Sequence, residues 1–288
     1  MKNINWSELG FGYFKTDYNV RCEYKDGKWG ELYATEDVNM NIHMASTCLH
    51  YGQEVFEGLK AFRGADGKVR LFRVEENAKR MINSGEYLKM AVPSVELFTK
   101  ACIEAVKLNA DYIPPYGSGA SLYLRPMLIG VGPQVGVKPS ADYLFAVFVT
   151  PVGPYYKDGF NCIKVIIDYD HDRAAPKGTG HVKVGGNYAA SLDSGEIAHQ
   201  KGFASVIFLD PATKQYIDEC SAANFFGIRD GKYITPDSHS VLPSITNKSL
   251  RQIAEDLGLK VEQRKVGVEE LPTFSEAGCC GTAACLLY

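Results

Sequence analysis

The sequence predicts a two-domain protein of the α/β class. Its 288 residues are enough for one large domain or two ordinary ones. Segments with strand-like alternation occur on both sides of a proline-rich stretch, and segments with helical spacing lie between them. We therefore expect a small domain over residues 1–150, a linker over 151–157 and a larger, sheet-rich domain over 158–288.

Turn and helix signals organise the first half of the chain. Asp66-Gly67 is typical of a tight turn, and a short strand is expected directly after it, over residues 69–72. A helix is predicted over 75–88. A second helix is predicted to begin after Ser94, because serine is a favoured N-cap residue.

Two strands follow these helices. Over residues 121–129 a period of two places Tyr123 and Arg125 on one face. An arginine there fits a solvent-exposed face or a polar cavity, and the strand alone does not separate the two. Residues 142–150 are aromatic and β-branched, which is typical of a buried strand. They run into a rigid stretch, Pro151–Tyr155, that could join two domains.

The second half alternates between strands, turns and helices. Strands are expected from Ile163, over 203–210, over 215–219 and in a hairpin around Asp230-Gly231. A helix is predicted over 188–199. A last helix opens at Pro243-Ser244 and stops at Gly258. Its apolar stripe consists of Leu250, Ile253, Ala254 and Leu257. Serine and threonine at its start suit an anion, although ordinary capping is the commoner role.

Composition excludes several classes of protein. The net charge is −3, and no nucleic-acid-binding pattern occurs. The first residues do not resemble a signal peptide, and no stretch is apolar and long enough to span a membrane. The eight cysteines form neither Cys-x-x-Cys nor a zinc-ligand spacing, so we expect no metal and reduced, mostly buried thiols in a cytoplasmic protein.

Lys183 is the lysine with the most unusual surroundings. Glycines precede it at 178 and 180 and follow it at 185 and 186. Glycine permits positive φ and a close approach of the backbone to a ligand, so we expect a flexible frame around the lysine. Desolvation of a lysine leaves a neutral amine that can attack a carbonyl group. For an arbitrary loop lysine, however, a side chain in water is the commoner arrangement.

Other segments supply groups that suit the same chemistry. Glu219 ends an apolar strand, the helix start at Ser244 suits phosphate, and the first half supplies arginines. Pyridoxal 5'-phosphate requires a lysine, an acid partner for its ring nitrogen and a phosphate site. The sequence therefore favours an enzyme that uses this cofactor.

Several motifs in order resemble one family over nearly the whole chain. These motifs are Tyr51–Phe62 (YGQEVFEGLKAF), Leu122–Pro126 (LYLRP), Pro151–Tyr155 (PVGPY), Lys183–Tyr188 (KVGGNY) and Gly281–Ala284 (GTAA). They are similar to the branched-chain amino acid aminotransferases, which share fold type IV with D-amino acid aminotransferase and aminodeoxychorismate lyase. The resemblance implies a small α/β domain, a larger pseudo-barrel domain and a homodimer.

The resemblance also implies residue roles. Lys183 matches the catalytic lysine that binds the cofactor covalently, Tyr188 the tyrosine at the cofactor's phenolic oxygen, and Glu219 the carboxylate at the pyridine nitrogen. The phosphate-binding positions correspond to Arg80, Ile245, Thr246 and Thr282. The substrate-binding positions correspond to Tyr51, Phe56, Tyr123, Arg125, Tyr155 and Ala283.

These roles agree with elementary chemistry. Glu219 would keep the ring nitrogen protonated, and Lys183 would act as general base and acid on the substrate's α-proton. Aromatic walls suit the side chains of leucine, isoleucine and valine. 2-Oxoglutarate would accept the amino group in the same pocket.

The chain departs from the family pattern at two places. Ser244–Asn247 replaces Gly-Ile/Val-Thr/Val-Arg, and the chain ends at Tyr288, where the family continues with a strand and a helix. We expect apolar surface to be exposed there. The family's redox-active cysteine pair corresponds to Ala284 and Leu287, so that switch is not expected. The alternatives are another enzyme of this fold and a cofactor-binding protein without turnover.

Overall fold

The chain forms two compact units. The computed structural model describes residues 2–153 and 162–283. Unit 1 comprises Met1–Lys157 and Lys183–Gly185, and unit 2 comprises Asp158–Val182 and Gly186–Tyr288. Each unit contains its own sheet and helices, which confirms the predicted mixed α/β class. The segment that carries Lys183 thus groups with unit 1, although its neighbours in sequence group with unit 2.

Unit 1 is built on an eight-stranded sheet whose recorded pairs are all antiparallel. The strand order is β2-β1-β8-β7-β5-β6, with β3 paired to β1 and β4 paired to β7. The strands are β1 Asn19–Lys25, β2 Lys28–Trp29, β3 Tyr33–Thr35, β4 Glu54–Phe56, β5 Leu59–Arg63, β6 Val69–Leu71, β7 Ser121–Gly130 and β8 Tyr143–Val152.

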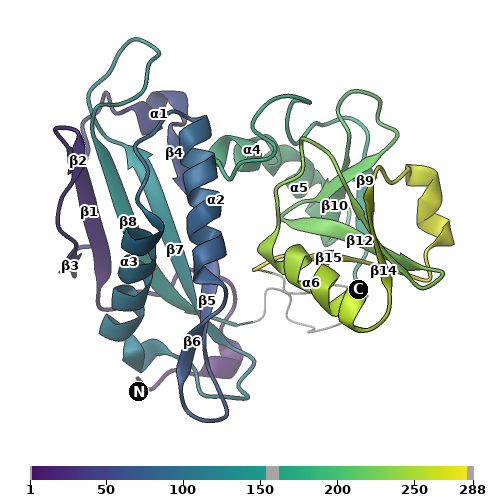
Figure 1. The fold of residues 1–288 in the computed structure, drawn as a ribbon, viewed down its shortest axis with the longest axis horizontal. Helices are drawn as coiled ribbons and strands as arrows, with labels where there is room; N and C mark the ends of the chain where they lie inside the picture. Colours follow the sequence, from purple (N-terminus) through teal and green to yellow (C-terminus); the bar gives the residue numbers. More distant parts are fainter. Residues whose placement is uncertain (1, 154–161, 284–288) are drawn as a thin grey trace. The chain divides into compact units, whose positions relative to one another are not determined.

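Two long helices cover one face of this sheet (Figure 1). They confirm the helices predicted over 75–88 and after Ser94, whose hydroxyl oxygen accepts from the amide of Leu97. Phe98 of α3 and Phe145 of β8 are fully buried and stack with their ring centroids 5.8 Å apart. The helical segments are η1 Trp6–Glu8, α1 Thr47–Tyr51, α2 Val74–Tyr87, α3 Val95–Leu108 and η2 Ala110–Tyr112.

Strand β8 is longer than the sequence predicted. It continues through Pro151 and Val152, which pair with Leu122 and Ser121 of β7. Pro151 is tolerated because a proline lacks only the amide donor, and its carbonyl can still accept. The first two residues of the rigid stretch therefore belong to the sheet.

Unit 2 contains a seven-stranded mixed sheet of order β14-β13-β12-β11-β10-β9, with β15 paired to β12. The pairs β9–β10 and β13–β14 are parallel. Asp230 and Gly231 both have positive φ, as the predicted hairpin turn requires. The strands are β9 Val165–Asp168, β10 Ser205–Leu209, β11 Ile217–Cys220, β12 Ala223–Arg229, β13 Lys232–Pro236, β14 Lys260–Arg264 and β15 Glu276–Cys280.

The helices of unit 2 differ from the prediction in two respects. The helix expected over 188–199 is interrupted at Ser191 and begins earlier, at Gly185. Ala254 of α6 is buried, but two other residues of the predicted apolar stripe are exposed, Ile253 in the helix and Leu257 at its C-cap. The helical spacing of apolar residues thus predicted the helix correctly, but it predicted a wider buried face than the structure has. The helical segments are α4 Gly185–Ala190, α5 Leu192–Gln200, α6 Ile245–Asp256 and η3 Val268–Thr273.

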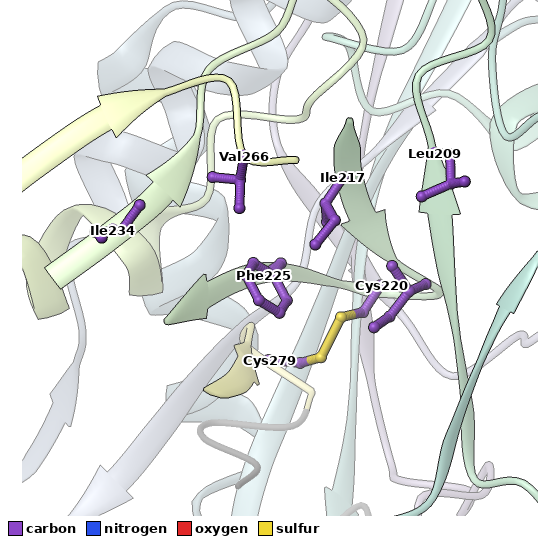
Figure 2. Close-up of a cluster of buried hydrophobic side chains, with 8 residues drawn as sticks. Leu209, Ile217, Cys220, Phe225, Ile234, Val266 and Cys279 are labelled. Atoms are coloured by element: carbon purple, nitrogen blue, oxygen red, sulfur yellow. A yellow bond between two sulfur atoms is a disulfide. The ribbon is translucent and has the colours of Figure 1, made fainter. Parts of the chain in front are cut away.

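A disulfide crosses the core of unit 2 (Figure 2). It joins Cys220 at the end of β11 to Cys279 in β15, with Cα atoms 6.4 Å apart. Phe225 and other apolar residues surround it. The expectation that the thiols are all reduced is therefore wrong for this pair, because the fold brings together two cysteines that lie 59 residues apart. Cys22, Cys102 and Cys280 are buried free thiols.

The described ranges contain no helix of the length and apolar character that a membrane crossing requires. Within the same ranges, no group of three or more His, Cys, Asp or Glu side chains is arranged to hold a metal ion.

Candidate active site

The backbone of Lys183 is fixed at two points within unit 1. Its amide donates to the hydroxyl of Ser84 in α2 at 3.0 Å. Its carbonyl oxygen accepts from the amide of Phe56 in β4 at 3.2 Å. Ser84 is fully buried. The flexible frame expected from the glycines is therefore wrong, since hydrogen bonds to a helix and a strand hold the lysine's main chain.

Gly185 adds a third fixed point. Its amide donates to Oε1 of Glu54, and a Cβ atom at Gly185 would lie only 2.1 Å from that oxygen. The glycine is thus needed for close approach, while its φ lies outside the left-handed region. Burial raises the pKa of Glu54, although the Gly185 amide and the charge of Arg125 act in the opposite direction.

The lysine side chain shares an aromatic ring with a second cation. The Lys183 ammonium lies 4.6 Å from the ring centroid of Phe56. The guanidinium of Arg125 lies 4.8 Å from the same ring and donates to the Tyr123 hydroxyl at 3.2 and 3.3 Å. Of the two alternatives for Arg125, the structure thus favours a half-buried polar environment over a solvent-exposed face.

Arg80 is held by a carboxylate that sequence analysis missed. Its Nε and Nη2 donate to the two oxygens of Glu57, both at 2.7 Å. Glu57 is fully buried and also accepts from Asn77 at 2.7 Å. Such a bidentate pair fixes the plane of a guanidinium group. The neighbouring Gly58 leaves room for the Tyr123 hydroxyl, which a Cβ atom would approach to 2.2 Å.

Other predicted substrate residues lie apart from this cluster or outside the described ranges. The Tyr51 hydroxyl donates to the carbonyl of Val135, and the side chain is 40% exposed. No recorded contact within the described part of unit 1 joins Tyr51 to Lys183. Tyr155 lies outside the described residues. Ala283 belongs to unit 2 and follows Thr282 after β15.

Glu219 is a buried carboxylate in β11 of unit 2. Its Oε1 accepts from the side-chain amide of Asn224 at 3.2 Å and from the backbone amide of Leu242. Its Oε2 lies 3.6 Å from Nε of Arg173, which is also buried. Neutral donors and a positive charge thus converge on the carboxylate, as its ionised form requires.

The start of α6 presents amide donors. The Ser244 hydroxyl caps Asn247 at 3.1 Å, while the amides of Ile245 and Thr246 have no hydrogen-bond partner among the residues that the structure describes. Free amides at a helix start suit a phosphate group. Within unit 2, these donors and the buried carboxylate of Glu219 are of the kinds that the phosphate and the ring nitrogen of pyridoxal phosphate require.

Asn247 replaces the family's arginine and has a structural role here. Its side-chain amide donates to Asn224 and Thr235, and its oxygen accepts from the Tyr233 hydroxyl at 2.8 Å. These bonds fix α6 against β12 and β13. The departure from the family pattern therefore leaves the amides of Ile245 and Thr246 available.

The comparison with known families decides the classification. Residues 54–287 match the family Amino-transferase class IV. The chain belongs to the class IV aminotransferases. This aminotransferase is 53% identical to a branched-chain-amino-acid aminotransferase of Haemophilus influenzae, over 99% of this chain and 84% of the relative.

Solved structures of the same family are also similar to this aminotransferase. The branched-chain amino acid aminotransferase of Escherichia coli matches with a TM-score of 0.78 and 28% identity, over 94% of this chain and 85% of the other. The T.th. branched-chain amino acid aminotransferase with pyridoxamine 5'-phosphate matches with a TM-score of 0.78 and 27% identity, over 95% and 85% of the two chains.

Sequence reasoning missed three polar residues of this aminotransferase that hold predicted site residues. They are Glu57, Arg173 and Asn224, all buried. Their common signal is a charged or amide side chain next to apolar or strand-forming residues, where an unpaired polar group would be costly. That signal could have identified these residues as candidates, but the residues that they contact could be identified only from the fold.

Proposed function

We propose that Lys183 and Glu219 carry the chemistry of this chain. The chain catalyses transamination of branched-chain amino acids, and its cofactor is pyridoxal 5'-phosphate. When bound, this cofactor withdraws electrons from the substrate's Cα. The assignment of Glu219 rests on the contacts of its two oxygens. Neutral donors bond to Oε1, and the Arg173 guanidinium lies near Oε2. A carboxylate held in this way can keep a ring nitrogen protonated.

Lys183 is proposed as the general base and acid of the reaction. Its ammonium lies over Phe56, and its backbone is fixed by Ser84 and Phe56. A fixed main chain limits the positions of Nζ to the rotamers of one side chain. The amine can therefore remove the α-proton and return it within a restricted volume.

Phosphate-binding roles are proposed for Arg80 within unit 1 and for the start of α6 within unit 2. Arg80 offers a guanidinium whose plane is set by Glu57, and Ile245 and Thr246 offer backbone amides. Thr282 and Tyr188 are proposed to bind the phosphate and the phenolic oxygen, respectively, as the family resemblance implies.

Substrate recognition is proposed for the aromatic cluster of unit 1. Phe56 and Tyr123 offer apolar surface to a branched side chain, and Arg125 offers a charge to the carboxylate of 2-oxoglutarate. Tyr51, Tyr155 and Ala283 remain proposed substrate residues by resemblance.

The remaining assignments are also proposals. We propose domains over 1–150 and 158–288 with a linker over 151–157, of which Pro151 and Val152 still pair within β8. We also propose a homodimer and a cytoplasmic location. Sedimentation tests the homodimer, which a monomeric and fully active protein would contradict. Cell fractionation tests the location.

The visible absorbance of the purified protein tests the function. A cofactor band that bleaches when L-leucine is added without a keto acid would establish the cofactor and the first half-reaction. D-Leucine is the control, and bleaching with it instead would indicate a D-amino acid aminotransferase. A band that responds to neither amino acid would indicate cofactor binding without turnover.

Replacement of the lysine tests its role. Lys183→Ala is expected to abolish covalent attachment of the cofactor, as judged by mass spectrometry after borohydride treatment. It is also expected to lower turnover on the order of a thousandfold, the scale of a lost general acid–base. Turnover at the wild-type rate would refute the assignment.

A further inference from the structure

Arg173 is a buried residue that connects two loops of unit 2. It lies in the bend after β9 and is 8% exposed. Its Nη2 donates to the carbonyl oxygens of Gly180, at 3.0 Å, and of Ser240. A Cβ atom at Gly180 would lie 2.5 Å from the same Ser240 oxygen, so the two backbones are in close contact. One guanidinium therefore ties the loop before Lys183 to the loop before α6.

The third contact of Arg173 is with Glu219. Its Nε lies 3.6 Å from Oε2, and the two side chains are 9% and 5% exposed. This distance is too long for a hydrogen bond, and Nε has no hydrogen-bond partner within the described ranges. The contact is thus an electrostatic one between two buried charges. A guanidinium in this position favours the ionised carboxylate, because an isolated buried charge is costly.

Two other titratable groups lie near Glu219 in unit 2. Asp218 precedes it in β11; burial raises the pKa of Asp218, although a hydrogen bond with Ser238 and the charge of Arg173 act in the opposite direction, so the guanidinium acts on both carboxyl groups. Burial also raises the pKa of Cys280 in β15 to about 12, so this thiol is neutral near pH 7. The neutral donors Asn224 and Leu242 both bond to Oε1. Arg173 supplies a positive charge on the side of Oε2.

We propose that Arg173 is a positioning residue that keeps Glu219 ionised and oriented for the ring nitrogen of the cofactor. This inference rests on the proposed function, which assigns Glu219 to that nitrogen. A residue that merely connects the two loops would contribute through its hydrogen bonds to Gly180 and Ser240. A positioning residue contributes through its charge as well. Replacement of Arg173 by lysine, which keeps the charge, therefore distinguishes the two roles.

The test compares Arg173→Gln with Arg173→Lys in the full chain. Both variants lose the guanidinium geometry, and only lysine retains the charge. We expect Arg173→Gln to weaken binding of added pyridoxal phosphate to the cofactor-free protein roughly ten- to a hundredfold, the scale on which an adjacent arginine stabilises an ionised carboxylate. It should also displace the pH profile of the bound cofactor's absorbance. Arg173→Lys should restore most of both properties while losing as much thermal stability as Arg173→Gln.

Arg264→Gln is the matched control. Arg264 forms an ion pair with Glu270 in the same unit, with Nη2 and Oε2 2.8 Å apart, and no predicted site residue takes part. This variant should change thermal stability alone. If Arg173→Gln behaves like Arg264→Gln, or if lysine restores neither property, Arg173 connects loops and the proposal is wrong.

A second variant keeps the test decisive if Arg173→Gln does not fold. Arg173→Met also removes the charge, and methionine fits buried sites; alone it should displace the absorbance profile, but added to Glu219→Gln, where the carboxylate is absent, it should cause no further change. An equal change with and without Glu219 would overturn the proposal. A wild-type protein without any cofactor band would instead overturn the proposed function, and the two failures are therefore distinguishable.

Discussion

Lys183 and Glu219 are held in opposite ways. The lysine is anchored through its main chain, by Ser84 and Phe56, and the adjacent Gly185 is anchored by Glu54. The carboxylate of Glu219 is anchored at its oxygen atoms, by Asn224, the amide of Leu242 and the charge of Arg173. These contacts fix Lys183 at its main chain and Glu219 at its functional group.

The difference corresponds to what each group is proposed to do. A general base must move a proton between positions, so anchors on the backbone leave torsions of the side chain for that movement. A carboxylate that maintains a charge acts best when it does not reorganise, because preorganised electrostatic groups cost nothing at the moment of reaction. The variants below separate these two modes of support, in order of decreasing expected effect.

The largest effect is expected from loss of the Glu219 charge. Glu219→Gln should lower turnover on the order of a hundred- to a thousandfold, as does loss of a preorganised electrostatic group. Steady-state kinetics with L-leucine measures this effect. Asp218→Asn is the matched control on the same strand, and its turnover should stay within a few-fold of wild type. Equal losses in both variants would show that any charge removed from β11 is damaging.

A pair of glycines tests the anchor behind the lysine. Gly185→Ala places a methyl group against Glu54 and should destabilise the protein by about 1–3 kcal/mol, as overpacking does. At Gly186 a Cβ atom would meet nothing within 4 Å. Gly186→Ala should therefore be neutral or stabilise α4 by about 0.5–1 kcal/mol. Denaturant unfolding measures the free energy of unfolding of both variants. A similar change in the two variants would contradict the anchor assigned to Gly185.

Ser84 tests whether the backbone anchor matters beyond stability. Ser84→Ala leaves the amide of Lys183 without its acceptor and should cost about 1–2 kcal/mol of unfolding free energy. Ser94→Ala removes the cap of α3 and should cost about 1 kcal/mol. The pH profile of the cofactor's absorbance should change only in Ser84→Ala. Identical profiles would mean that the serine contributes to folding alone.

The smallest effect is expected at Glu54. Burial raises the pKa of its carboxyl above the value of 4.5 that it has in the unfolded chain. The relevant pH interval lies between 4.5 and the higher pKa of Glu54 in the folded protein. As pH rises through it, the unfolded state releases its proton first, so the free energy of unfolding falls with rising pH. Glu54→Gln should remove that fall and retain an oxygen for the Gly185 amide. Thermal melts across this pH range measure it, and an unchanged slope would contradict the assigned cause.

Local signals predicted much of the fold. The Ser94 cap and the Asp230-Gly231 turn were readable because their causes lie within a few residues. The exposure of Ile253 and Leu257 was not readable, since a period gives the face of a helix but not what covers it. The same limit applies to the lysine segment, where glycines predicted flexibility and contacts from α2 and β4 fixed the backbone.

The candidate site shows a similar division. Lys183 and Glu219 could be singled out by residue type, spacing and family resemblance. Arg173 and Glu57 could not be assigned, because each is defined by a partner distant in sequence. Cys220 and Cys279 were expected to be reduced, since no spacing rule brings them together.

The disulfide gives unit 2 a covalent ring. It joins positions 59 apart in sequence and closes a loop that contains α6 and the strands from β12 to β14. In a chain-entropy model, closure of a loop of this length removes conformational entropy from the unfolded chain and so stabilises the folded state by about 4 kcal/mol. It also means that a protease cut between Cys220 and Cys279 releases no fragment. The start of α6, where phosphate binding is proposed, would stay tethered to the strand of Glu219 in a nicked molecule until a reductant opened the ring.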